Sequence, residues 1–320
     1  MFIPHSSRII PHTKALVITI LQTQLIILIL IVVGFCITKA GLFSAKTKAD
    51  MTNVVLYIVL PCNIFSSFHK GISSETIIQC AIVLLAAFGL QLLYILLNKI
   101  LYIKFTPERR IVVQYATIVN NASFIGLPVI GSVYGEIGML YGSFVLIPIR
   151  IFMWTAGLSL YTKAEKKQRI KVVATHPCIW AVILGFVYAL VTFELPAFLS
   201  GAITAIGNCN LALSMIIIGS ILSEADLKHL QDKDCFYYSF FRLIAIPAFV
   251  FGVLWLLRAD PLTSGVIVLS SAMPAAATTA MLADKYGKDS AFASKLVFTS
   301  TILSMITLPI IAVLLARALS

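Results

Sequence analysis

The sequence predicts an all-α integral membrane protein with about ten transmembrane helices, and three observations lead to this fold class. Hydrophobic residues make up 60% of the 320 residues, and the mean hydropathy is +0.99. A single soluble core of this length cannot bury so much apolar surface. Apolar runs such as Leu25–Ile37 and Ala81–Leu97 continue without alternation, whereas a membrane β-barrel would alternate apolar and polar residues. Helices satisfy their own backbone hydrogen bonds in lipid, so helices are the expected spans.

A span of about 20 residues divides the chain into apolar segments joined by short loops. The expected helices lie near residues 15–38, 51–68, 75–98, 110–133, 137–161, 174–193, 197–222, 236–257, 262–284 and 290–317. The expected domains are a first five-helix repeat over 1–161, a basic cytoplasmic linker over 162–173 and a second, inverted repeat over 174–320. Loops this short cannot hold a soluble catalytic domain, so we expect function to lie among the helices.

The formal net charge is +11, and its distribution predicts a membrane topology rather than nucleic-acid binding. Lys and Arg concentrate in alternate loops, at Lys39, Lys46, Lys48, Lys99, Lys104, Arg109, Arg110, Lys163, Lys166, Lys167, Arg169, Lys171, Lys228, Lys233, Lys285 and Lys288. The positive-inside rule places these loops in the cytoplasm. The opposite face holds little beyond Arg8, Lys14, Lys70, Arg258 and Arg317. We therefore expect a multi-pass protein of the plasma membrane with both termini outside the cell, although Arg8 and Lys14 count against this orientation.

Two stretches of the chain resemble each other and predict an internal repeat. Asn120–Gly135 and Ser270–Gly287 are each interrupted by small residues and a proline, and each closes on a Tyr-Gly pair. In two halves of five helices, both stretches belong to the fourth helix of their half, which makes them helices four and nine. An odd number of helices per half gives the halves opposite orientations in the membrane.

The interruptions predict a binding site. Pro128 and Pro274 each remove a backbone donor within an apolar span, and irregular backbone at membrane depth persists where protein buries it or where it lines a wet cavity. Asn120 and Asn121 add hydrogen-bonding groups without a buried charge. A tolerated kink is the alternative, and it is the preferred interpretation for the prolines that lack matched surroundings: Pro61, Pro148, Pro247 and Pro309.

Charged residues within the spans are few. Arg150 lies well inside the fifth helix, where a charge usually faces a cavity or a partner; it attracts an anionic substrate, holds a structural partner or binds a lipid headgroup. Arg242 and Lys295 are nearer to helix ends, from which their side chains can reach the interface. The carboxylates lie near predicted helix ends, at Glu75, Glu136, Glu194, Asp284 and Asp289. A Na⁺/H⁺ antiporter needs buried acids and is disfavoured.

Enzymatic, metal and redox functions find no support in the sequence. The chain contains no His-x-x-x-His, Gly-x-Ser-x-Gly, Walker A or paired-carboxylate motif, and its six cysteines have no metal-ligand spacing. We expect no enzyme activity, no cofactor and no metal, with Na⁺ or H⁺ as a candidate coupling ion.

The motifs resemble the auxin efflux carrier family, which includes plant PIN auxin exporters and bacterial permeases assigned to malate and related carboxylates. The family's fourth-helix pattern matches Asn121, Gly126, Pro128, Tyr134 and Gly135. A proline break followed by Ala-x-x-Tyr is similar to the family's ninth helix and ends on Ala283 and Tyr286. A Leu-Pro-x-x-Ile-Phe segment like that of its second helix contains Pro61. The resemblance covers nearly the whole chain.

The resemblance implies an architecture like that of the sodium/bile-acid symporters or NhaA. Broken helices four and nine would cross inside a transport domain, the other helices would form a scaffold, and an elevator mechanism would move substrate bound at the crossing. It implies a homodimer and a site made of Asn120, Asn121, Pro128, Pro274, Ala275, Asn208, Asn210, Pro61 and Asn63. The plant carriers have an acidic residue early in the transport domain, and no carboxylate occupies a clear mid-helix position here.

Three functions remain open at this point. The first is secondary active transport of small organic anions, carboxylates or auxin-like acids. The others are a passive anion channel and a membrane sensor without transport. Repeated broken helices favour the carrier, because alternating access moves a midplane site against a fixed scaffold. A sensor would usually carry a cytosolic output domain, for which the loops leave no room.

Overall fold

The computed structural model describes residues 13–68, 73–161, 174–191, 194–224 and 232–319. The basic linker predicted over 162–173 and several of the predicted topogenic charges, including Arg8, Lys70 and Lys228, lie outside the described residues.

Helices account for all the regular structure of the described residues, apart from one isolated β-bridge between Asn120 and Ala275. In chain order the helices, with π-helical segments marked η, are α1 Thr13–Lys39, α2 Ala45–Val54, η1 Val55–Val59, α3 Leu60–Ser66, α4 Ser74–Leu101, α5 Pro107–Ile118, η2 Ala122–Gly126, α6 Leu127–Phe152, η3 Met153–Gly157, α7 Leu158–Tyr161, α9 Pro177–Leu190, α10 Ala197–Glu224, α11 Lys233–Phe240, η5 Phe241–Ala245, α12 Ile246–Leu256, α13 Pro261–Ser271, α14 Thr278–Lys285 and α15 Ser290–Ala318.

Six helical runs of the described chain are long and apolar enough to cross a membrane: Lys46–Ser66, Ser74–Leu101, Ala122–Tyr161, Ala197–Ser223, Lys233–Leu256 and Ser290–Ala318. Shorter apolar helices cover Leu25–Lys39, Pro177–Leu190 and Pro261–Ser271. The run of 40 residues from Ala122 contains parts of the predicted fourth and fifth helices. Gly135, at φ 64° and ψ −155°, divides it.

Three of the described π-helical segments have a common sequence cause. Each is followed at once by an X-Pro pair, namely Leu60-Pro61, Leu127-Pro128 and Ile246-Pro247. Proline cannot donate to the carbonyl four residues earlier. The residue before it instead donates to the carbonyl five residues back, as Ile246 does to Phe241. The kinks predicted at Pro61 and Pro247 therefore take the form of single π-helical turns.

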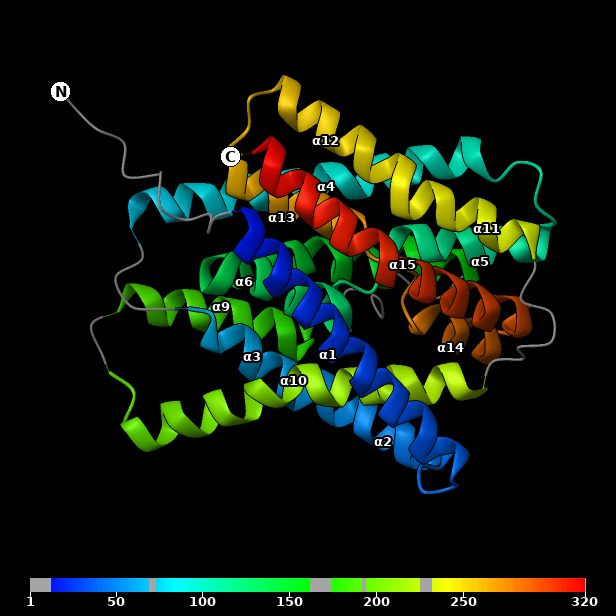
Figure 1. Ribbon diagram of the computed structural model, residues 1–320, viewed down its shortest axis with the longest axis horizontal. Coiled ribbons are helices and arrows are strands. Elements are labelled where there is room, and N and C mark those ends of the chain that lie inside the picture. Colours follow the sequence, from blue (N-terminus) through cyan, green and yellow to red (C-terminus); the bar gives the residue numbers. More distant parts are fainter. Residues whose placement is uncertain (1–12, 69–72, 162–173, 192–193, 225–231, 320) are drawn as a thin grey trace.

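By their contacts the helices divide into two groups, here called bundles, with α1 of the smaller bundle also packed against α15 and α6 of the larger one (Figure 1). The smaller bundle contains α1, α2, α3, α9 and α10, and the larger one contains α4, α5, α6, α7 and α11 to α15. In the smaller bundle α1 and α10 approach at backbone distance, because a side chain at Gly34 would meet the Ile216 carbonyl and one at Gly219 would meet that of Ile31. The resemblance had implied that all helices except the two broken ones form a separate scaffold. The third, fifth, eighth and tenth predicted helices instead pack with the broken helices in the larger bundle.

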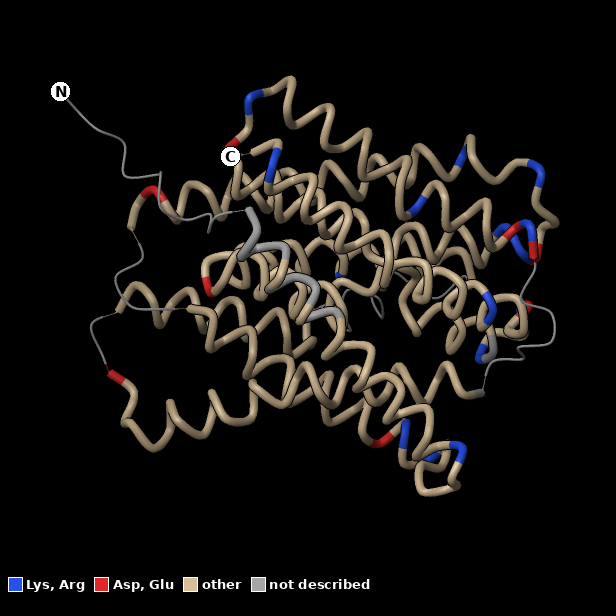
Figure 2. Tube along the Cα trace, in the orientation of Figure 1, with Lys and Arg blue, Asp and Glu red and all other residues tan. Residues whose placement is uncertain are grey.

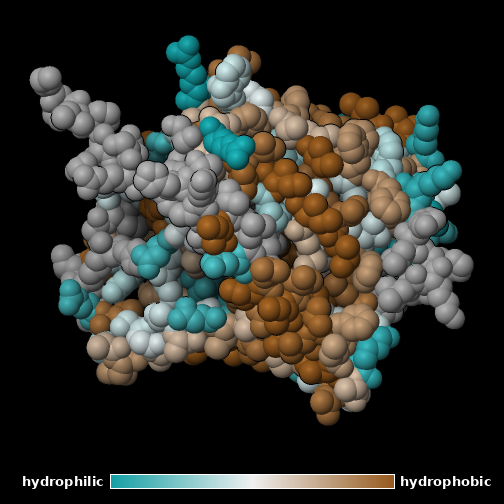
Figure 3. Space-filling view, viewed as in Figure 1, coloured by the Kyte–Doolittle hydropathy of each residue, from teal (hydrophilic) through white to brown (hydrophobic). Residues whose placement is uncertain are grey.

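The surface separates into a hydrophobic middle and polar ends. Figure 3 shows apolar residues over the centre of one face, with hydrophilic residues toward its edges. In Figure 2 most Lys and Arg residues gather at one end of the molecule, here called the basic end. The helix α4 shows the same polarity, because Glu75 lies in its first turn and Lys99 in its last.

Candidate functional site

Two helices of the larger bundle are interrupted at the same place. Regular structure stops at Ile118, the end of α5, and resumes at Ala122; it stops again at Ser271, the end of α13, and resumes at Thr278. The backbone N–H of Asn121 donates to the Pro274 carbonyl at 2.8 Å, and the backbone N–H of Ala276 donates to the Val119 carbonyl at 3.4 Å. The backbone groups freed by one break therefore satisfy those freed by the other, as buried polar groups require.

The neighbouring asparagines have different surroundings. The Asn120 side-chain nitrogen donates to the Ser270 carbonyl at 2.5 Å, so Asn120 ties the first break to the end of α13. The Asn121 side chain is only 5% exposed, lines a cavity and has no hydrogen-bond partner in the described part of the chain. At the breaks, Asn121 is therefore the asparagine whose whole side-chain amide is available to a ligand.

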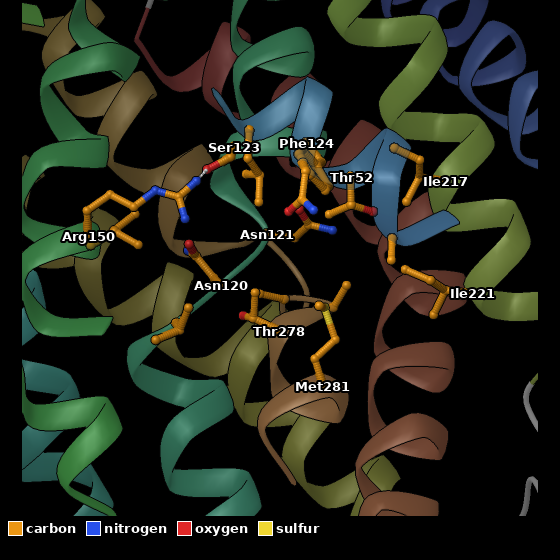
Figure 4. Close-up of a pocket in the computed structure, with 17 residues that line it drawn as sticks. Thr52, Asn120, Asn121, Ser123, Phe124, Arg150, Ile217, Ile221, Thr278 and Met281 are labelled. Carbon is orange, nitrogen blue, oxygen red and sulfur yellow. Dashed lines mark hydrogen bonds between the residues drawn. The ribbon is translucent and has the colours of Figure 1, made fainter. Parts of the chain in front are cut away.

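The cavity has a volume of about 240 Å³ and lies between the two bundles (Figure 4). The smaller bundle contributes Ala49, Thr52, Asn53, Leu56, Ile217 and Ile221. The larger bundle contributes Val119, Asn120, Asn121, Ser123, Phe124, Ile149, Arg150, Ala276, Ala277, Thr278 and Met281. Most of this lining is apolar, and the polar groups come from the breaks, from Arg150 and from Thr52 and Asn53 of α2, which is typical of a small-molecule site.

A second cavity of about 190 Å³ continues toward the basic end and reaches Lys48. It shares Thr52, Ile221, Ala277 and Met281 with the first. Ala49 and Met281 are exposed, so the two cavities together form a path from the breaks to the surface.

Arg150 places a positive charge in the cavity wall. Its side chain is 5% exposed. One terminal nitrogen donates to the Ser123 hydroxyl at 2.7 Å and the other contacts the Met153 sulfur at 3.5 Å, while Nε has no partner. Among the described residues no carboxylate lies within ion-pair distance of this guanidinium. A buried charge with so few partners favours an incoming anion.

The helix ends at the breaks add to this electrostatic preference. The cavity is lined by Ser123 and Phe124, at the start of the helical run that begins at Ala122, and by Thr278, the first residue of α14. Helix N-termini carry partial positive charge. Both resumed helices therefore direct that charge toward the space beside Arg150.

Arg242 lies on the other side of the breaks and is fully buried, at 0% exposure. Its Nε donates to the Met273 carbonyl at 2.9 Å and one terminal nitrogen donates to the Thr117 carbonyl at 3.0 Å. Its guanidinium carbon lies 4.6 Å from the centre of the Tyr94 ring. The expectation that Arg242 reaches the membrane interface is therefore wrong, because its side chain points inward from the π-helical turn before Pro247.

The structure brings only part of the predicted site together. Asn120 and Asn121 line the cavity, and Pro274 and Ala275 form the second break without lining it. Pro128 is wrongly placed at a break by the sequence argument, since it is the second residue of α6 and lies beyond the first break.

The polar residues expected from the second and seventh helices lie elsewhere. Asn208 is exposed, and the Asn210 side-chain oxygen accepts a hydrogen bond from Ser214 at 3.2 Å. Pro61 and Asn63 are half-buried, and the Asn63 side-chain nitrogen donates to the Gly207 carbonyl at 3.2 Å, within the smaller bundle.

The structure adds Asn53 and the hydroxyl residues Thr52, Ser123 and Thr278 to the polar lining. Two of these hydroxyls stand directly beside the breaks, and proximity to the matched stretches is the signal that could have found them. Thr52 lies two helical turns before Pro61, and nothing in its local sequence distinguishes it from other helix residues.

Comparison with known proteins identifies the chain. A family model described as membrane transport protein matches residues 19–176 and 166–312. An uncharacterised transporter of Methanothermobacter thermautotrophicus is 26% identical over 301 residues, which cover 92% of this chain and 98% of the relative. An uncharacterised transporter of Methanocaldococcus jannaschii is 26% identical over 305 residues, covering 90% and 96%. The chain thus belongs to the membrane transport protein family, the auxin efflux carrier-like family that its motifs resemble, and is a multi-pass membrane transporter.

Proposed function

We propose that the protein is a secondary active transporter, an efflux carrier or permease, that moves small organic anions such as carboxylates or auxin-like acids. The observation that carries this proposal is the cavity at the paired breaks, where the unpartnered side-chain amide of Asn121 faces the same space as Arg150. A carboxylate would accept hydrogen bonds from both groups, and the apolar wall of Leu56, Ile217 and Ile221 would contact its carbon skeleton.

We further propose an elevator mechanism, in which the larger bundle moves against the smaller one. The breaks and Arg150 belong to the same larger bundle, so a movement of that bundle would carry them together. In the described residues one side-chain hydrogen bond joins the bundles, a 3.5 Å contact between the Ser67 and Ser143 hydroxyls. Aromatic contacts such as Phe68 with Phe144, at 6.0 Å between ring centres, accompany it. An interface with so few hydrogen bonds would allow the larger bundle to slide along the smaller one.

The two matched stretches support ten spans in two inverted halves. The halves of the broken helices that precede the breaks have similar lengths, 12 residues in α5 and 11 in α13. The Tyr-Gly pairs end on Gly135 and Gly287, which have φ values of 64° and 60°, a conformation that glycine adopts without strain. The corresponding glycines thus share a positive φ as well as the Tyr-Gly sequence.

Direct transport assays test the proposal. Purified protein in liposomes should accumulate radiolabelled malate, a monocarboxylate or indole-3-acetate, with Na⁺, H⁺ and voltage gradients imposed in separate arms. Saturable uptake with counterflow of unlabelled anion supports a carrier. Uptake that rises linearly with concentration and follows voltage alone would identify a passive channel, and no uptake under any gradient would favour a sensor.

Asn121→Ala provides the test of the site. We expect it to abolish substrate binding while the protein stays folded in detergent, because Asn121 makes no side-chain hydrogen bond to the described protein. The matched control is Asn208→Ala, which removes the same amide from an exposed position on α10. Unchanged affinity in Asn121→Ala would contradict a site at the breaks.

Thiol labelling tests the direction of the path and the membrane orientation. In a variant that lacks Cys36, Cys62, Cys80, Cys178, Cys209 and Cys235, we expect Met281→Cys to react with a charged thiol reagent from the cytoplasmic side. Glu75 lies in the first turn of α4, at the end of that helix opposite Lys99, so Glu75→Cys should react from outside. The reverse pattern would overturn the proposed orientation with both termini outside. Crosslinking in membranes tests the proposed homodimer separately.

A further inference from the structure

Arg242 contacts the backbone of both broken helices and lies outside the cavity lining. We propose that Arg242 is a built-in counter-cation, which neutralises the carbonyl ends of α5 and α13 in the place that a bound coupling cation would otherwise take. The consequence for uptake rests on the proposed transport function. The stabilisation of the two helix ends by Arg242 does not depend on it.

The need for a cation follows from the geometry of the breaks. The carbonyl ends of α5 and α13 meet at one point, and each carries partial negative charge from the helix dipole. Thr117, near the end of α5, and Met273, just after α13, present carbonyls to the same guanidinium at 3.0 and 2.9 Å. A guanidinium, with several N–H groups in a fixed plane, can bridge two carbonyls from different helices in this way.

The surroundings of Arg242 include an aromatic ring and a second hydrogen-bond donor to α5. Arg242 is 0% exposed and lies over the Tyr94 ring, which favours a cation further. The Tyr238 hydroxyl donates to the Ala116 carbonyl at 2.9 Å, so a neighbouring carbonyl of α5 is satisfied too. No Asp or Glu of the described chain pairs with Arg242. Its counter-charge is therefore the two helix ends themselves.

This arrangement has a consequence for ion coupling. In secondary transporters with broken helices, unwound carbonyls and half-helix C-terminal ends coordinate Na⁺ or take part in proton coupling. Here a covalently attached cation already occupies those carbonyls. An anion bound on the opposite, N-terminal side of the breaks then needs no bound Na⁺ at the helix ends.

Charge-specific rescue tests the role of Arg242 without any substrate. The purified Arg242→Gln variant should unfold at a lower temperature than the wild type in the same detergent. Guanidinium ion, added well below denaturing concentrations, should restore part of the difference. Urea has nearly the same size and shape without the charge and should restore none, and Arg242→Lys should fall between the wild type and Arg242→Gln.

Arg110→Gln is the matched control, because Arg110 also donates to main-chain carbonyls, of Tyr102 at 2.9 Å and Phe105 at 3.2 Å, but at the surface end of α5. It should change the unfolding temperature little and show no guanidinium rescue. Equal rescue of Arg242→Gln by urea, or an unfolding temperature equal to that of the wild type, would overturn the proposal. If Arg242→Gln cannot be purified, the same comparison is made on Arg242→Lys.

Uptake then tests the consequence for coupling. Wild-type liposomes should take up indole-3-acetate or malate equally in Na⁺, K⁺ and N-methylglucamine media of one pH. A loss of uptake of about tenfold or more in Na⁺-free media, the factor that 1.4 kcal/mol of coupling would produce, would overturn this consequence. If the wild type takes up no carboxylate at all, the proposed transport function fails, while guanidinium rescue still decides the role of Arg242.

Discussion

The two arginines in the interior of the larger bundle resemble each other in burial and differ in their partners. Arg150 is 5% exposed and Arg242 is 0% exposed, and neither has a carboxylate partner among the described residues. Arg242 donates to carbonyls of two helices, whereas Arg150 meets a hydroxyl and a sulfur at the edge of a cavity. The difference indicates that one charge stabilises the breaks and the other is available to a ligand.

Removal of Arg242 should have the largest effect on stability. In Arg242→Met the carbonyls of Thr117 and Met273 lose a charged donor and have no water to replace it, so we expect the free energy of unfolding to fall by about 3–5 kcal/mol. Chemical unfolding in detergent measures this change. If Arg242→Met loses less unfolding free energy than Arg150→Met, then Arg242 is not the arginine that stabilises the breaks.

Removal of Arg150 should affect binding rather than folding. Arg150→Met deletes a poorly paired buried charge, so stability should stay constant or rise, while affinity for the transported carboxylate should fall by about 30- to 150-fold, the equivalent of a charged hydrogen bond of about 2–3 kcal/mol. Concentration-dependent uptake and thermal unfolding on the same preparation check both parts. A variant that unfolds early and still binds normally would make Arg150 a structural residue.

Tyr238→Phe, a substitution close to Arg242, should lower stability less than the removal of Arg242 does. The hydroxyl donates to the Ala116 carbonyl at 2.9 Å within the buried end of α5, and its loss should lower the free energy of unfolding by about 1 kcal/mol without changing substrate affinity. Unfolding curves for both proteins measure the first quantity and uptake the second. Weakened binding at unchanged stability would show that the two sides of the breaks are not separate.

The smallest change is expected for Ser123→Ala. Its hydroxyl orients Arg150 through a 2.7 Å hydrogen bond, so the variant should reduce affinity by only about threefold, because the guanidinium remains beside the cavity. The apparent affinity from uptake provides the measurement. A loss as large as that of Arg150→Met would show that Ser123 contacts the substrate itself.

The fold could be predicted further than the site, and particular residues show why. Hydropathy depends on composition along the chain, so the apolar helices follow from it, and the proline among small residues predicts the interruption near Pro274. Hydropathy contains no information about which way a side chain points. Arg242 was therefore assigned to the interface by its distance from a helix end, although the π-helical turn before Pro247 directs it inward.

The position of the first break shows a second limit of the sequence. Pro128 predicts an interruption, but its missing donor is accommodated by the π-helical turn Ala122–Gly126, and the chain opens at Val119–Asn121 instead. That opening is held by hydrogen bonds to residues some 150 positions away, such as Asn120 with Ser270. Long-range pairing of this kind requires the fold. Asn121 was nevertheless predicted at this site, because it lies in one of the two matched stretches, Asn120–Gly135 and Ser270–Gly287.

The short helix α9 has a consequence for the surrounding bilayer. It has 14 residues and α10, the next helix along the chain, has 28, which at 1.5 Å per residue makes them about 21 and 42 Å long. Trp180, Ile183, Leu184 and Val187 face outward from α9, and this apolar face is shorter than a hydrocarbon layer of about 30 Å. Acyl chains beside α9 should be compressed while those along α10 are not. Lipids with shorter acyl chains should then suit this side of the protein, and transport rates in liposomes of graded acyl-chain length would reveal that preference.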